Sequence, residues 1–113
     1  MSRNLDYLAD ILSEARLLLE HLQGRTRVDL DADPMLQAAV LWRLAVIGEA
    51  ARRIPVEDRA AFANLPWRGM VTMRNVLIHQ YDAIDLDIVW DTLSNDVPGL
   101  VASLEQLLGN RGG

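Results

Sequence analysis

The chain has 113 residues, of which half are hydrophobic, and a formal charge of −5 with an isoelectric point near 4.8. This length is typical of one domain with a hydrophobic core of its own. The acidic balance argues against a protein that coats nucleic acid through general charge attraction. The absence of cysteine excludes disulfides, thiolate metal sites and cysteine nucleophiles.

No segment of the sequence resembles a targeting or membrane-spanning element. Residues 1–10 lack the continuous apolar stretch of a signal peptide, and no segment approaches the ~18 unbroken apolar residues of a membrane span. We therefore expect a cytoplasmic protein that has no membrane partner.

Helical periodicity is strong in the first half of the chain, and strand patterns are missing. Apolar residues at three- and four-residue spacing predict a first helix that ends near Gly24. The polar stretch over residues 24–33 is interpreted as a loop. Asp33 is then expected to cap a second helix that begins at Pro34 and runs to about Arg53, since proline at the first helical position loses no hydrogen bond.

The second half of the chain continues this pattern. A short helical piece leads to Pro66, and the next helix, with Met70, Met73, Leu77 and Ile84 as its core stripe, is expected to fade near residue 82. Asp85 can cap a last helix.

The last helix contains leucines that recur every seven residues from residue 86 to residue 107, across Pro98. This unbroken register favours one helix kinked at Pro98 over two separate helices. We predict an all-α fold, in which residues 1–113 form a single antiparallel bundle of four to five helices.

One helix carries an unusual set of polar residues, RNVLIHQY, which runs from Arg74 to Tyr81. On an ideal helix Arg74 and Tyr81 lie nearly in line, Asn75 and His79 share a face, and Arg74 and His79 are about 140° apart. If two such helices met across a two-fold axis, both sets would border one cleft. The spacing also allows a monomeric arrangement.

Arginine together with histidine suits cleavage of an RNA phosphodiester. The RNA 2′-OH is an internal nucleophile, a histidine can transfer its proton, and an arginine can stabilise charge on the phosphoryl oxygens. Such cleavage needs no metal or cofactor and leaves a 2′,3′-cyclic phosphate, whereas DNA lacks the 2′-OH. The alternative is an arginine in a surface ion pair and a histidine hydrogen-bonded at the edge of the bundle.

The residues around this motif are a more specific indication of function than the spacing of its arginine and histidine. The pattern R-N-x3-H-x-Y comprises Arg74, Asn75, His79 and Tyr81, and it is followed by Asp85, Trp90 and the sequence Asp96-Val97-Pro98. Together with IGEAARRIP at residues 47–55, the segment 65–100 resembles the HEPN superfamily and, more closely, the HepT-type toxins of prokaryotic toxin–antitoxin pairs. The resemblance extends from the first helix to Leu108.

This resemblance implies a helical bundle that forms a homodimer and acts as a metal-independent RNA endonuclease. The catalytic residues would be Arg74 and His79 of both protomers, with Asn75 as their polar neighbour. The resemblance also implies a minimal nucleotidyltransferase antitoxin that silences the toxin by attaching AMP to Tyr81.

Several further charged residues are candidates for an auxiliary role. Glu49 could orient the arginine or histidine of the motif, or it could pair with Arg52 or Arg53 three and four residues away. Arg52, Arg53 and Arg68 could add positive potential near the cleft. Arg52 and Arg53 would equally suit the negative end of their helix dipole.

Two other functions are compatible with the sequence. The chain could be a non-catalytic helical subunit of a minimal nucleotidyltransferase complex, binding nucleotide or partner without cutting RNA, and the acidic isoelectric point fits this alternative. A plain helical interaction module would tolerate substitution throughout the motif.

Overall fold

The computed structural model describes residues 2–109, with only the backbone described for Ser2 and Tyr81. These residues contain no strand and form six α-helices, together with two 3₁₀ segments and one π-helical segment. The all-α prediction is confirmed. The helices are α1 (Ser2–Leu22), α2 (Arg27–Ala32), α3 (Pro34–Arg53), α4 (Trp67–His79), α5 (Leu86–Asp91) and α6 (Val97–Gly109), and the shorter segments are η1 (Val56–Phe62), η2 (Tyr81–Ala83) and η3 (Thr92–Asp96).

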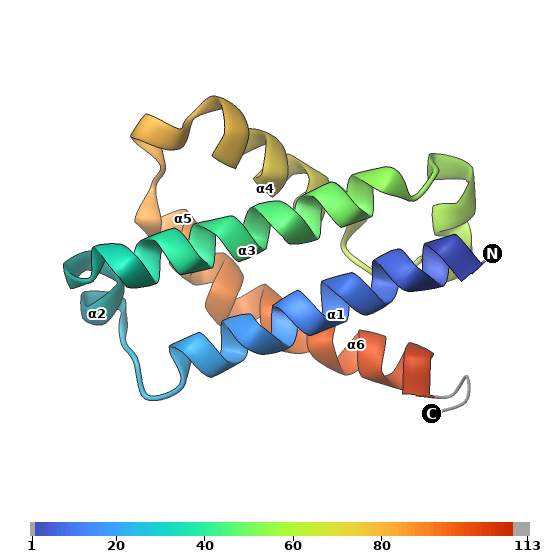
Figure 1. Ribbon diagram of the computed structural model, residues 1–113, viewed down its shortest axis with the longest axis horizontal. Coiled ribbons are helices and arrows are strands. Elements are labelled where there is room, and N and C mark those ends of the chain that lie inside the picture. Colours follow the sequence, from blue (N-terminus) through green and yellow to red (C-terminus); the bar gives the residue numbers. More distant parts are fainter. Residues whose placement is uncertain (1, 110–113) are drawn as a thin grey trace.

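The two longest helices, α1 and α3, lie side by side and run in opposite directions along the long axis of the molecule (Figure 1). The helix α6 packs against α1, and α4 packs against α3 on the other side of this pair. Across the bundle these four helices follow the order α4–α3–α1–α6. The motif helix α4 therefore lies at one edge and packs against only one of the two longest helices, α3.

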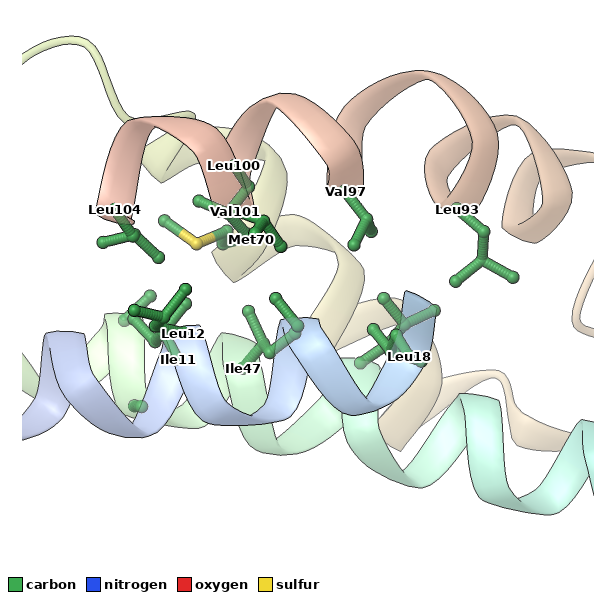
Figure 2. Close-up of a cluster of buried hydrophobic side chains, with 14 of the residues drawn as sticks. Ile11, Leu12, Leu18, Ile47, Met70, Leu93, Val97, Leu100, Val101 and Leu104 are labelled. Atoms are coloured by element: carbon green, nitrogen blue, oxygen red, sulfur yellow. The ribbon is translucent and has the colours of Figure 1, made fainter. Parts of the chain in front are cut away.

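The apolar stripes of these helices meet in one core. Figure 2 shows Ile11, Leu12 and Leu18 of α1 facing Val97, Leu100, Val101 and Leu104 of α6, with Ile47 of α3 and Met70 of α4 between them. Within the described part of the chain, no polar or charged side chain is fully buried. The core is therefore stabilised by dispersion and the hydrophobic effect, without buried polar contacts.

The prediction of a loop over residues 24–33 is wrong in part, because this segment contains the helix α2. The backbone N–H of Thr26 donates to the carboxylate of Asp29 (2.7 Å), and the N–H of Asp29 donates to Oγ1 of Thr26 (3.4 Å), which is a capping box for α2. The predicted cap of α3 is confirmed, since Oδ1 of Asp33 accepts from the N–H groups of Met35 (3.0 Å) and Leu36 (3.1 Å).

The helical run from residue 86 to residue 109 is continuous, as expected, but its irregularity precedes Pro98. Residues Thr92–Asp96 form a π-helical turn, and the N–H of Val97 donates to the carbonyl of Thr92, five residues earlier. Pro98 has no N–H to donate and its ring crowds the carbonyl four residues before it, so the preceding turn widens. Asp85 caps this run by accepting from the N–H of Asp87 (2.9 Å).

Candidate active site

The motif lies on α4, which begins after Pro66 and ends at His79. The expected extension to residue 82 is wrong, because Gln80 has non-helical dihedral angles (φ −129°, ψ 32°) and a 3₁₀ turn follows. Tyr81 therefore does not continue the helix, and its expected alignment with Arg74 along one helical face does not hold. The side chain of Tyr81 is outside the described part of the structure.

Arg74 is fixed at the crossing of α4 over α3. Its Nε donates to Oε1 of Glu49 (3.1 Å), and one of its terminal nitrogens donates to Oδ1 of Asn75 (3.0 Å). The Arg74 side chain is 22% exposed, so its guanidinium is partly shielded from solvent. The structure thus brings two of the three expected catalytic residues, Arg74 and Asn75, into direct contact.

Glu49 makes both kinds of contact considered from the sequence. Its carboxylate pairs with Arg52 (2.8 Å) and Arg53 (3.2 Å) on its own helix and with Arg74 on α4. The hydrogen bond from Arg52, the charge of Arg52, and the contacts of Arg53 and Arg74 lower the pKa of Glu49 from 4.5 to about 2, although partial burial opposes the shift. Glu49 is therefore ionised at any physiological pH.

The Arg74–Glu49 pair faces a groove of about 720 Å³ between α1, α3 and α4. Tyr7, Asp10, Ser13 and Glu14 line it from α1, Trp42, Ala45, Val46, Glu49, Ala50 and Arg53 line it from α3, and Arg74 and Ile78 line it from α4. Trp42 is 68% exposed and Ile78 51% exposed, which is unusual for such large apolar side chains. The groove therefore joins charged groups to an exposed apolar surface.

His79 is exposed at the end of α4 and is not among the residues that line the groove. It lies five residues after Arg74, which corresponds to about 7.5 Å along the helix axis and about 140° around it. Asn75, also exposed, lies one turn before His79 on the same side. A single copy of the chain thus holds Arg74 and His79 on different sides of α4.

The three auxiliary arginines differ in position. Arg52 and Arg53 belong to the cluster around Glu49, whereas Arg68 is exposed in the first turn of α4 and does not line the groove. Gly48 was not predicted as a site residue. It is buried where α3 meets α4, and a Cβ atom there would lie 2.2 Å from Cβ of Arg74. The sequence does contain a signal for this residue, because Gly48 lies inside an amphipathic helix and on its buried face.

A second, mostly apolar cavity of about 440 Å³ lies between α3, α4 and the α5–α6 run, and Gln80, Asp85 and Asp96 are among its few polar lining residues. Within residues 2–109, no three or more His, Asp or Glu side chains are grouped so that they could hold a metal ion. In the same range, no helix is both long and apolar enough to cross a membrane.

The family model described as Ribonuclease HepT-like matches residues 11–107 of this chain. The chain belongs to the HepT-like ribonuclease family. The resemblance stated from the motif is thereby confirmed at the level of the family, and no solved structure matches the chain.

The chain is similar to several proteins that are named as ribonucleases. It is 34% identical over 102 residues to "Putative RNase TTE0752" of Caldanaerobacter subterraneus subsp. tengcongensis, covering 90% of this chain and 91% of that protein. It is 36% identical over 102 residues to "Probable ribonuclease HepT" of Thermococcus cleftensis, covering 90% and 93% of the two chains. These alignments span nearly the full length of both proteins.

Proposed function

We propose that this protein is the toxin of a toxin–antitoxin pair and acts as a homodimeric, metal-independent RNA endonuclease. The observation that carries the proposal is the fixed guanidinium of Arg74, which faces an open groove from the same helix that presents His79 to solvent. Membership of the HepT-like ribonuclease family supports RNA as the substrate.

In the proposed reaction the RNA 2′-oxygen forms a bond to phosphorus while the bond from phosphorus to the 5′-oxygen breaks. His79 removes the proton of the 2′-OH or supplies the proton that the leaving 5′-oxygen takes up. Arg74 stabilises the charge that grows on the phosphoryl oxygens, and Asn75 holds one edge of its guanidinium. The products are a 2′,3′-cyclic phosphate and a free 5′-OH, and DNA is not a substrate.

In the proposed dimer, the second copy of the chain supplies the histidine that one protomer does not place beside its own Arg74. Because Arg74 and His79 lie on different sides of α4, a dimer that pairs the two α4 helices would combine Arg74 of one protomer with the partner's His79. The exposed Trp42 and Ile78 at the groove are suited to a dimer interface, since large aromatic and aliphatic side chains dominate such contacts.

Regulation would act at Tyr81, two residues after His79. A minimal nucleotidyltransferase antitoxin would attach AMP to the tyrosine oxygen, which places a phosphate and an adenosine next to the catalytic histidine. The neighbouring residues Gln80 and Asp82 are exposed, so the turn is accessible to a second protein. The added anion would compete with RNA for the arginine of the site.

The test is cleavage of total cellular RNA by the purified, unmodified protein in EDTA, with an intact-mass measurement to show that Tyr81 carries no adduct. Wild type should give discrete fragments, and Arg74→Ala and His79→Ala should lower the rate by about 100-fold or more. Arg16→Gln and His21→Gln are the matched controls, because these residues contact Glu105 and Arg43 away from the motif.

Wild-type protein that leaves RNA intact would contradict the proposal. The non-catalytic alternative, a nucleotide- or partner-binding subunit of a nucleotidyltransferase complex, would then be favoured, and it fits the net charge of −5.

A further inference from the structure

We infer that Gly48 and Glu49 together position Arg74: Gly48 lets α4 approach α3 at this residue, and Glu49 fixes the inner edge of its guanidinium so that the outer edge faces a substrate phosphate. This inference rests on the proposed function for the role of the phosphate. The positioning itself is a property of the fold and can be tested without RNA.

The backbones of α3 and α4 approach each other closely at Gly48. A Cβ atom on this residue would lie 2.2 Å from Cβ of Arg74 and 2.6 Å from the carbonyl oxygen of Met70. Neither atom is the end of a flexible side chain, so α4 would have to move away from α3. By contrast, the helical residues Gly69 and Gly99 have open space around the corresponding position.

Both carboxylate oxygens of Glu49 accept hydrogen bonds from arginines. Oε1 accepts from Nε of Arg74 (3.1 Å) and Nε of Arg52 (3.2 Å), and Oε2 accepts from Arg52 (2.8 Å) and Arg53 (3.2 Å). One carboxylate thus orients three guanidinium groups, and the cluster keeps an excess of positive charge. Arg74 is held in place without losing its attraction for an anion.

The contacts of Arg74 leave part of its guanidinium for a ligand. An arginine has five N–H donors, and within the described residues Nε is used by Glu49 and one terminal N–H by Asn75. The other terminal N–H groups can donate to a phosphate in paired fashion. Glu49 therefore restricts the rotation of Arg74 from the side opposite to the expected substrate.

This arrangement predicts a specific kinetic signature. Removing the carboxylate of Glu49 frees Arg74 to rotate, which lowers kcat because the phosphoryl oxygens lose a prepositioned donor. The same change removes a negative charge beside the groove, so RNA binding should not weaken. A merely structural role would instead raise KM or lower the amount of folded enzyme.

The first measurement is the ¹⁵N–¹H signal of the Arg74 Nε–H group in labelled protein, assigned by its loss in Arg74→Lys. Wild type and the controls Glu105→Gln and Gly99→Ala should share one sharp, slowly exchanging signal. Glu49→Ala should abolish it, and Gly48→Ala should shift it.

The second measurement is RNA cleavage by the same proteins. Glu49→Ala should lower kcat by about 10- to 100-fold with KM unchanged or lower. Glu49→Gln keeps an oxygen that can accept from Nε and should recover part of kcat. Thermal unfolding of each variant shows that the comparison is made on folded protein, and Glu49→Gln remains informative if Gly48→Ala does not fold.

An unchanged Arg74 signal in Glu49→Ala, or a kcat equal to that of wild type, would overturn the inference. If wild type cuts no RNA, the proposed function fails, and the Arg74 signal alone decides whether Gly48 and Glu49 position this side chain.

Discussion

Replacing Gly48 by alanine should destabilise the protein, whereas the same replacement at Gly99 should stabilise it. Both residues lie inside helices, α3 and α6, and alanine has a higher helix propensity than glycine by about 1 kcal/mol. They differ in the surroundings of the added methyl group. At Gly48 it would lie 2.2 Å from Cβ of Arg74, whereas at Gly99 nothing lies within 4 Å of it.

The magnitude follows from these two terms. Overpacking a core costs about 1–3 kcal/mol, and the upper part of this range applies to Gly48 because the overlapping atoms belong to the helix itself. After the gain in helix propensity, Gly48→Ala should lower the free energy of unfolding by about 1–2 kcal/mol. Gly99→Ala should raise it by about 0.5–1 kcal/mol.

The assay is thermal unfolding followed by far-ultraviolet circular dichroism, with all variants at the same protein concentration because the midpoint of an associating protein depends on concentration. At about 4 °C per kcal/mol for a domain of this size, the midpoint should fall by about 4–8 °C for Gly48→Ala and rise by a few degrees for Gly99→Ala. A rise for both variants would show that α3 and α4 do not need the close approach at Gly48, and the steric reasoning would fail.

Three other predictions follow from the same site. Trp42→Glu should convert the proposed dimer to monomer in sedimentation velocity, because it places a charge in the apolar surface beside Ile78. Because the pKa of Glu49 is lowered to about 2 in the folded protein, its ionised carboxylate stabilises the fold fully above about pH 4.5, and this stabilisation is lost as the pH falls toward 2. In acid denaturation, the difference in free energy of unfolding between wild type and Glu49→Gln should therefore become smaller below pH 4.5. Tyr81→Phe should take up no AMP by intact mass when incubated with ATP and the nucleotidyltransferase antitoxin.

The features predicted correctly from the sequence are those set by neighbours along the chain. Asp33 and Asp85 cap their helices because the cap needs only a short side chain and the next two or three N–H groups. The helix α2 was missed because six residues are too few to show a periodicity, although Thr26 and Asp29 have the spacing of a capping box.

The end of α4 at His79 was missed for a different reason. No glycine or proline marks it, and Gln80, the first non-helical residue, is common within helices. The contact between Glu49 and Arg74 was foreseen only as one of two alternatives, because these residues are 25 positions apart and meet only through the crossing of α3 and α4. That crossing depends on Gly48, whose neighbours cannot be identified before the fold is known.

The position of His79 follows from helix geometry. A separation of five residues places two side chains about 140° apart on any α-helix, so Arg74 and His79 diverge within one protomer. A proton-transfer group and a phosphate-binding group can act on one phosphate only if both reach it, and the proposed dimer provides this with the partner's His79. The ion pair with Glu49 holds Arg74 in position within each protomer. Of the two groups, only the histidine then has to be brought to the site by dimerisation.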